Sequence, residues 1–568
     1  MEGRRIPLDR LTWQRWRRAT WRFVRSEVGG RARALFLALL ALLVAINGLN
    51  VVNSYVGRDF MTAIEARSKS GFLFEALLYV GVFAASTVAA VIYSFCEQRL
   101  GLLWRAWLTR GLIERYLHDD TYYWLREHDE LPNPDQRIAE DVRTFTATTL
   151  SLLLILLNAT FTIVAFSGVL WSISPLLFGT AVAYAALGSG LTVLFGRPLI
   201  WLNYQQSDRE ADLRASLVHV RENAESVALL HREGRLGARL GKRVDALVAN
   251  TRRIIAVNRN LGFFTTGYNY LIQIIPVLIV APLFIGGHVE FGVITQSSMA
   301  FSTLIGAFSL IVTQFQQISS YAVVLARLGV FAESVEEVAA DGARGIVHDD
   351  GGDGIAWQEL TLRSPHDGTV LLAGLSASVR SGTRVLVTGP NEAARFALFR
   401  ATARLWNAGE GRIVRPPPGT ILFVPERPYL PPGTLREALV QTGQEQAISD
   451  ARIAEVLRAL GVDGVFARSG GLDAEQDWDD LLSLGEQQLL GFARIVLAKP
   501  RFAVLDRPAT LLPRELVERT CALLAESAIT VVTFERDAAL AAHHDAQLEI
   551  GEGGRWVWRP LAQASRSA

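Results

Sequence analysis

The stretch "LVTGPNEAARFALFR", Leu386 to Arg400, has the order of features found in phosphate-binding loops. It follows the apolar run "TRVLV" and leads into a segment with a helical pattern. In such a loop small residues let backbone N–H groups approach phosphates, a lysine reaches them, and a hydroxyl binds Mg²⁺. Nearly all of those residue types are different here, so the stretch is a nucleotide site, the remains of one, or a coincidence.

Composition predicts a membrane protein. Half of the 568 residues are hydrophobic, and the mean hydropathy is +0.23. Lys+Arg number 57 against 56 Asp+Glu, and this net charge of +1 gives no reason to expect a nucleic-acid partner. The two cysteines, Cys96 and Cys521, lie in different surroundings and indicate neither a disulfide framework nor a zinc site.

Apolar stretches of about 20 residues, long enough to cross a bilayer, occur six times. They lie near residues 34–56, 72–96, 148–173, 176–196, 262–287 and 293–322. Arginine crowds the N-terminus and the segments 99–143 and 197–259, so the positive-inside rule places both termini in the cytoplasm. The helical pattern of the long connections predicts that the membrane helices continue beyond the bilayer.

Four parts are expected along the chain. The Arg- and Trp-rich residues 1–30 predict an amphipathic elbow helix on the cytoplasmic membrane surface, the alternative being a solvated or disordered tail. A membrane domain of six transmembrane helices over 31–337 and a Gly/Asp-rich linker over 338–354 follow. Residues 355–568 alternate short Val/Ile/Leu strands with helices, which predicts an α/β domain.

Four strings in that last domain resemble an ATP-binding cassette (ABC). "VLVTGPNEAARFALFRATARLW" is similar to the Walker A region, "ILFVPERPYLPPGTLREAL" to the Q-loop, "LLSLGEQQLLGFARIVLAKP" to the signature and "RFAVLDRPATLL" to Walker B. Four matches in the right order are far more specific than one, and they leave an unrelated α/β domain as the weaker alternative. The resemblance implies an α/β ABC-type nucleotide-binding domain.

On that alignment the phosphate loop is degraded. The glycine positions hold Glu392 and Ala394, the lysine position Arg395 and the hydroxyl position Phe396. Glu392 would bring a carboxylate to the phosphates, and like charges about 4 Å apart cost roughly 1 kcal/mol even in water. The loop residues left as candidates for nucleotide binding are Gly389, Asn391 and Arg395.

The catalytic positions have changed as well. Asp506 remains as a metal ligand, but Arg507 replaces the glutamate that polarises water, Glu426 the Q-loop glutamine and Glu535 the switch histidine. Pro513 takes the place of the D-loop aspartate. We therefore expect no catalytic residue and no general base.

The signature survives, and its helix N-terminus suits an anion. Its candidate binding residues are Ser483, Gly485 and Gln487. The sequence thus predicts the remains of a nucleotide site, with no cofactor. The alternative is a site that binds ATP and Mg²⁺ weakly without hydrolysis.

The membrane half resembles the SbmA/BacA-like peptide and vitamin B12 transporters and their YddA-type relatives with a fused cassette. The similar strings are "LNVVNSYVGRDFMTAIEARS", "NPDQRIAEDVRTFT", "GRPLIWLNYQQSDREADLRASLVHVRENAESVALL" and "FFTTGYN". This resemblance implies a homodimer in a bacterial inner membrane. In members without a cassette it also implies uptake of peptides driven by the proton gradient.

Proton coupling needs carboxylates whose pKa is raised by partial burial and like-charged neighbours. The candidates in the membrane half are Asp59, Glu65, Glu140, Asp141, Glu210, Asp212, Glu222 and Glu225. Glu222 and Glu225 lead, because a spacing of three puts both on one face of a helix. The alternatives are structural ion pairs at the membrane boundary and a solvated helix face.

Three functions follow from these expectations. The first is a homodimeric transporter of peptide-like or hydrophilic solutes, driven by the proton gradient, whose cassettes serve dimerisation. The second is an ATP-driven transporter with weak residual ATPase activity. The third is a membrane receptor or scaffold that transports nothing.

Overall fold

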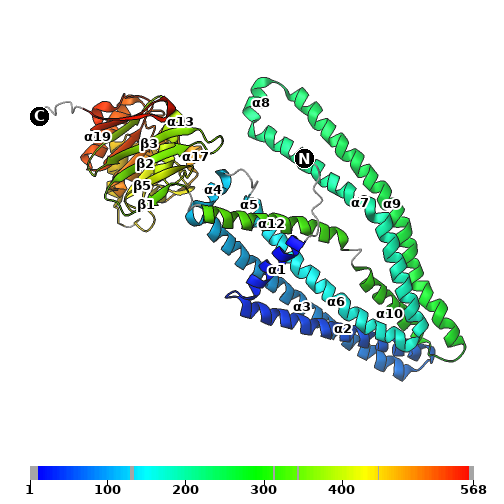
Figure 1. Ribbon diagram of the computed structural model, residues 1–568. Helices are drawn as coiled ribbons and strands as arrows, with labels where there is room; N and C mark the ends of the chain where they lie inside the picture. The colour runs from blue at the N-terminus through cyan, green and yellow to red at the C-terminus, as the bar shows by residue number, and fades with distance from the viewer. Residues whose placement is uncertain (1–9, 128–133, 311–313, 342–344, 445–446, 562–568) are drawn as a thin grey trace. The chain divides into compact units, whose positions relative to one another are not determined.

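The computed structural model describes residues 10–127, 134–310, 314–341, 345–444 and 447–561 (Figure 1). They form two compact units. The helical unit comprises Met1–His118 and Asp129–Val335, and the α/β unit comprises Asp119–His128 and Glu336–Ala568. The α/β unit is therefore built from two separate segments of the chain.

The helical unit consists of long helices and a few short ones. They are α1 Arg10–Val24, α2 Gly29–Glu65, α3 Lys69–Leu117, α5 Pro134–Gln136, the π-helix η2 Arg137–Asp141, α6 Val142–Ile173, α7 Pro175–Glu222, α8 Ala224–Leu230, α9 Glu233–Ile285, α10 Gly292–Phe308 and α12 Phe315–Asp341. The last residues of α12 count with the α/β unit. In Figure 1, α7 and α9 run side by side and α8 joins them at one end.

Five helical segments of the described residues are long and apolar enough to cross a membrane. They are Gly29–Glu65, Lys69–Leu117, Pro134–Ile173, Pro175–Glu222 and Glu233–Ile285. These contain nearly all of the first five predicted stretches. The sixth, 293–322, holds the 17-residue α10 and the start of α12, while residues 311–313 lie outside the described ones. Six spans therefore remain a prediction.

The apolar surface of these spans is only partly covered within one chain. Leu77 of α3 is 72% exposed and Phe263 of α9 is 77% exposed. The helices pack where small and aromatic residues meet: Tyr184 of α7 stacks on Tyr268 of α9 with ring centroids 4.3 Å apart. A Cβ at Gly188 would lie 2.3 Å from the Tyr268 ring, so glycine allows this close approach. The exposed apolar side chains are those that lipid would cover.

Helix α1 covers part of the expected amphipathic segment, but its apolar side faces the protein. Phe23 is buried and its ring stacks on Trp104 of α3, with centroids 5.0 Å apart. Trp16 and Ala19 pack into the same core. The apolar face of α1 is therefore not available to enter a membrane, and the placement of residues 1–30 on the membrane surface stays a prediction.

Two main sheets organise the α/β unit. The larger has the order β12-β11-β4-β10-β9-β6, and all its strands are parallel except β12. Its strands are β4 Val385–Thr388, β6 Ile421–Val424, β9 Phe502–Asp506, β10 Thr530–Phe534, β11 Ala546–Ile550 and β12 Trp556–Pro560. Every residue of β4, β9 and β10 is buried, which is why these strands read as nearly continuous apolar runs.

The smaller sheet has the order β1-β5-β2-β3, and a third, two-stranded sheet pairs β7 with β8. Their strands are β1 Val347–Asp349, β2 Ile355–Arg363, β3 Val370–Val379, β5 Gly409–Val414, β7 Gly433–Thr434 and β8 Glu475–Gln476. The helices of the unit are α4 Thr121–Glu127, α13 Glu392–Thr402, α14 Leu435–Leu439, α15 Asp450–Ala459, α16 Asp463–Arg468, α17 Trp478–Leu481, α18 Leu484–Ala498 and α19 Arg514–Glu526. Short 3₁₀ turns are η1 His118–Asp120, η3 Ala541–His543 and η4 Glu552–Gly554.

Part of the predicted linker 338–354 is regular structure. Helix α12 continues to Asp341, and β1 pairs in parallel with β5, with Val347 opposite Arg412. A Gly/Asp-rich composition conceals a strand of three residues, because such a strand carries almost no periodic signal.

A buried histidine makes the stability of the α/β unit depend on pH. The Nε2 of His544 lies 2.9 Å from the Thr533 hydroxyl and its Nδ1 2.8 Å from the Leu540 carbonyl oxygen. Burial lowers the pKa of His544 to about 4. Because the folded pKa is below the unfolded one, the stabilisation is complete above about pH 6.5 and is lost as the pH falls toward 4.

We expect His544→Asn to flatten this pH dependence. The unsubstituted full chain in nanodiscs should lose on the order of 3 kcal/mol of unfolding free energy between pH 7 and 4 because His544 takes up a proton on unfolding. Urea unfolding at pH steps across that range measures it. His366→Asn, at an exposed position of the same unit, is the matched control and should leave the slope unchanged. An unaltered slope in His544→Asn would contradict the assignment.

Candidate functional site

Gly389 and Asn391 shape the loop between β4 and α13. Gly389 has a φ of +129°, and a Cβ there would lie 2.0 Å from the carbonyl oxygen of Ile550, so only glycine fits. The Asn391 Oδ1 accepts a hydrogen bond from the Ala394 N–H at 3.0 Å, which caps α13. Its Nδ2 donates to the Leu371 carbonyl at 3.3 Å. Both residues have a structural explanation within the chain.

Arg395 and Phe396, at the lysine and hydroxyl positions, face protein partners. Arg395 is 5% exposed, and its Nη1 donates to the Glu535 carbonyl oxygen at 2.6 Å. Burial lowers the pKa of its guanidinium. The guanidinium carbon of Arg400 lies 3.9 Å from the centroid of the Phe396 ring. Arg395 therefore brings a positive charge to the lysine position, but its Nη1 is bonded to the protein backbone.

Arg507 is the centre of a cluster of opposite charges. Its Nη1 lies 2.8 Å from Glu392 Oε1, its Nη2 2.7 Å from Glu426 Oε2, and its Nε 3.9 Å from Asp506 Oδ1. We call these four residues the Arg507 cluster. The phosphate loop, the Q-loop segment and the end of β9 each supply a carboxylate to it. Three substitutions that looked independent in the sequence therefore compensate one another in charge.

Asp506, a member of this cluster, and Glu535, which lies beside it, are both buried. Burial raises the pKa of Asp506 to about 6, opposed by Arg507 and reinforced by Glu426. The Glu535 Oε2 accepts from the Ala509 N–H at 3.2 Å, and its Oε1 from the Arg536 N–H at 3.0 Å. Glu535, which the alignment puts at the position of a phosphate-sensing histidine, thus accepts hydrogen bonds from the loop backbone.

A cavity of about 380 Å³ opens next to the cluster. Glu392, Arg395, Arg507 and Glu535 all line it. A guanidinium stays protonated at every physiological pH and cannot take a proton from water. Arg507, which the sequence alignment puts at the catalytic glutamate position, is therefore unable to act as a general base.

The signature residues are used by helix α18. Ser483 is its N-cap, with its Oγ 3.3 Å from the Glu486 N–H, while Glu486 Oε2 accepts from the Ser483 N–H at 3.0 Å. The Gln487 Nε2 donates to the Leu482 carbonyl at 3.4 Å. Because this capping box places a carboxylate in the first turn of α18, the N-terminus of the helix is less suited to an anion than the sequence suggested. Gly485 lies within the same first turn.

The leading proton-coupling pair does not share a helix. Glu222 is the last residue of α7, Asn223 interrupts the helix with a φ of −111°, and Glu225 lies in α8. Both glutamates are exposed. The prediction that they form one helical face is wrong, because the spacing rule holds only inside an unbroken helix.

The other candidates are also dispersed. Asp59 is in α2, one turn before Thr62, whose Oγ1 accepts from the Gly292 N–H at 3.1 Å where α10 begins, just beyond the end of α9. Glu222 lies near the other end of α9, whose 53 residues span about 80 Å. Glu140 is exposed on η2. The structure therefore does not bring Glu222, Glu225, Glu140 and Asp59 together.

The other coupling candidates of the helical unit are either bonded to a neighbouring side chain or exposed. Asp141 is 2% exposed and pairs with Arg327 at 2.5 Å, and Asp59 pairs with Arg58 at 2.7 Å. Glu210 accepts from Gln206 at 2.9 Å. Glu65 and Asp212 are exposed. For Asp59 and Asp141 the structure favours the ion-pair alternative.

We expect Asp141→Asn to destabilise the helical unit by about 3 kcal/mol. The change leaves Arg327 without its counter-charge next to the buried Arg137, whose Nη1 donates to the Arg327 carbonyl. Thermal unfolding of the full chain in nanodiscs measures the effect. Asp59→Asn is the matched control: its pair is 30% and 41% exposed, so it should cost less than about 1 kcal/mol. Equal losses in the two variants would refute the prediction.

Two features escaped the sequence reading. The first is the pairing within the Arg507 cluster, which could have been found by noting that Arg507 gains a positive charge while Glu392 and Glu426 gain negative ones. The second is the position of Arg400, whose guanidinium carbon also lies 5.7 Å from the Tyr123 ring of α4. No motif marks that contact, since the two residues are far apart in sequence.

Comparison with known proteins identifies both units. Residues 22–285 match the family model described as ABC transporter transmembrane region 2, and residues 372–510 match the model described as ABC transporter. An ABC transporter ATP-binding protein of Synechocystis is 34% identical over 92% of this chain and 81% of its own length. ABC transporter D family member 2, chloroplastic, of Arabidopsis thaliana is 33% identical over 95% and 86%. The inner membrane ABC transporter ATP-binding protein YddA of Escherichia coli is 24% identical over 88% and 91%.

These matches run through the spanning helices of the helical unit and through the strands that carry the Arg507 cluster. The relatives at 34% and 33% identity cover nearly the whole chain, so the similarity is not confined to one unit. The chain belongs to the ABC transporter family, with D-family members among its relatives.

Proposed function

We propose that this ABC transporter works as a homodimer without hydrolysing ATP. The observation that carries the proposal is Arg507, which stands at the catalytic glutamate position and forms ion pairs with Glu392 and Glu426. One arginine faces three carboxylates in this cluster, so the site keeps a net negative charge that repels the phosphates of a nucleotide. One helical unit and one α/β unit per chain support a pair of chains as the working assembly.

The proposed cargo is a peptide-like or other hydrophilic solute. Support comes from the SbmA/BacA-like strings of the membrane half, whose resemblance implies peptide and vitamin B12 transport. We place the protein in a bacterial inner membrane with the α/β unit in the cytoplasm, supported by the arginine-rich connections and by the name of the YddA relative.

The proposed energy source is the proton gradient. A membrane potential of 100 mV supplies about 2.3 kcal/mol per proton, enough for modest accumulation of a solute. Exposed Glu222 and Glu225 lack, within one chain, the burial that such a group needs, and Asp59 is held by Arg58. Glu222→Gln, Glu225→Gln and Asp59→Asn are therefore compared side by side, and the variant that loses uncoupler-sensitive uptake identifies the carrier.

Proteoliposomes test the proposal directly. We expect peptide uptake to survive removal of ATP and to fall when an uncoupler collapses the proton gradient. We also expect no magnesium-dependent ATP hydrolysis above that of Asp506→Asn, which controls for contaminating ATPase. Turnover that disappears in Asp506→Asn would overturn the proposal in favour of an ATP-driven transporter. Absence of uptake under both ATP and a gradient would favour the receptor or scaffold alternative.

A further inference from the structure

The exposed face of α1 is a stripe of arginine. At 100° per residue, Gln14, Arg17, Arg18, Trp21 and Arg22 fall in one arc of about 140°. Arg25, in the turn directly after α1, continues this arc, since its N–H donates to the Trp21 carbonyl. All six are exposed. The packed side chains Trp16, Ala19 and Phe23 fall in the opposite arc. Exposure and helical position thus agree on which face meets the surroundings.

Arg15 lies outside this stripe and, unlike Arg17 and Arg18, is paired with a carboxylate in the described part of the chain. It lies at the edge of the packed arc and makes a two-pronged ion pair with Glu333 of α12, with its Nη2 2.6 Å from Glu333 Oε2. The stripe arginines Arg17 and Arg18 have no such carboxylate among the described residues. Glu27, exposed in the turn after α1, is the one acidic residue of the sequence between 14 and 31.

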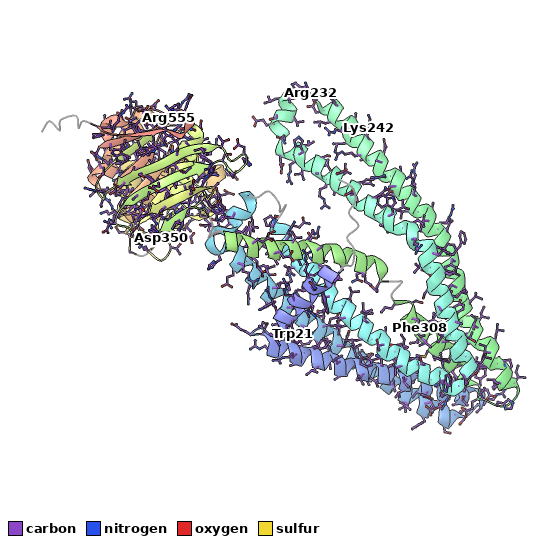
Figure 2. The ribbon with its side chains drawn as sticks, viewed as in Figure 1. Trp21, Arg232, Lys242, Phe308, Asp350 and Arg555 are labelled. Carbon is purple, nitrogen blue, oxygen red and sulfur yellow. The ribbon has the colours of Figure 1, made fainter. Side chains whose placement is uncertain are left out.

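The stripe also contains a hollow and an aromatic anchor. A hollow of about 700 Å³ is lined, among the described residues, by Gln14, Arg17, Arg18 and Trp21. Trp21 is 55% exposed, and the guanidinium carbon of Arg25 lies 4.7 Å from the centroid of its ring. Figure 2 labels Trp21 on this helix. Tryptophan among arginines is the composition that suits the headgroup level of a bilayer.

Helix α1 lies directly before the start of a membrane-spanning helix. The spanning helix α2 begins at Gly29, four residues after Arg25, and its first strongly exposed apolar side chain is Leu37, 64% exposed. Arg31 and Arg33 precede that residue and are exposed as well. Helix α1 therefore adjoins the transition from polar to lipid-facing surface, where phospholipid headgroups lie.

We propose that the α1 stripe binds the phosphate groups of anionic phospholipids. Because its apolar side packs on the protein, the helix holds lipid by charge instead of inserting. Each arginine near a membrane surface strengthens association with anionic lipid about five-fold. This inference is independent of the energy source proposed above, because it concerns neither ATP nor protons.

A photo-crosslinker at position 21 tests this locally. The full chain with p-benzoylphenylalanine in place of Trp21 is placed in nanodiscs of either phosphatidylglycerol or phosphatidylcholine, and lipid adducts are counted by mass spectrometry. We expect adducts with phosphatidylglycerol to exceed those with phosphatidylcholine by at least about five-fold. The excess should shrink when salt is raised, because exposed charges are screened.

The decisive variant is Arg17→Gln with Arg18→Gln and Arg25→Gln, in which the excess should vanish. The matched control removes three exposed arginines of the same unit, Arg221, Arg232 and Arg235, at the end of the α7–α9 pair where Figure 2 labels Arg232. That control should keep the excess, and Arg17→Lys with Arg18→Lys and Arg25→Lys should keep most of it. Equal yields from both lipids, equal loss in both triple variants, or crosslinking mainly to a protein or nucleic acid would overturn the proposal.

Discussion

The purified protein should bind Mg·ATP no more tightly than about 1 mM. Glu392 brings a carboxylate to the phosphate loop, and Phe396 offers no hydroxyl for the metal. Arg395 cannot replace the missing lysine, because its guanidinium is buried and donates to the Glu535 carbonyl. Isothermal calorimetry on the full chain in nanodiscs measures the affinity, and a submicromolar dissociation constant would contradict this account of the loop.

Restoring the loop should recover affinity. We expect Glu392→Gly, Ala394→Gly, Arg395→Lys and Phe396→Ser together to tighten binding at least about 100-fold, since a like charge is removed and a charge-assisted contact is gained. Phe396→Ser alone is the control, and it should gain much less because Glu392 remains. If the single change restored as much as four, the carboxylate would not be the obstacle.

Reversing the charge of Arg507 should cost the α/β unit about 2–3 kcal/mol. Arg507→Glu looks like a repair of the catalytic position, yet it would face Glu392, Glu426 and Asp506 after removing the arginine that pairs with them. Hydrogen exchange of β4 and β9 amides in the full chain measures the loss of protection. We expect no ATP hydrolysis to accompany it.

Arg514→Glu is the matched control for that reversal. Arg514 lines the same cavity, but it is 73% exposed, and its ion pair is with Glu518 one turn away. Its loss should cost less than about 1 kcal/mol. The triple neutral variant Glu392→Gln, Glu426→Gln and Arg507→Gln should be more stable than Arg507→Glu. Destabilisation of similar size in Arg514→Glu would show that the cluster has no special role.

The sequence predicted the α/β order and the long helices well because both depend on local periodicity. Strands β4, β9 and β10 are buried along their whole length and read as apolar runs. The spans of α2, α3 and α9 are recognisable because lipid requires long apolar stretches. Each of these signals lies within a window of a few turns.

What sequence could not supply are pairings between distant positions and breaks between close ones. Arg507 meets Glu392 from 115 positions away, and no periodicity encodes such a contact. In contrast, Glu222 and Glu225 are three positions apart, but the backbone bend at Asn223 separates them. The direction in which α1 turns its apolar face could not be predicted for a related reason: an amphipathic pattern indicates that an apolar face is buried, not whether protein or lipid buries it.

The α/β unit takes one of its helices, α4, from the middle of the helical chain. The Tyr123 hydroxyl donates to the Leu405 carbonyl oxygen at 3.1 Å, and its ring faces Arg400. The C-terminal region alone is therefore not a complete, exchangeable domain. Recombination that replaced residues 345–568 by those of a relative would remove the residues that α4 contacts. Tyr123 and its neighbours should therefore be inherited together with the distant helix α13.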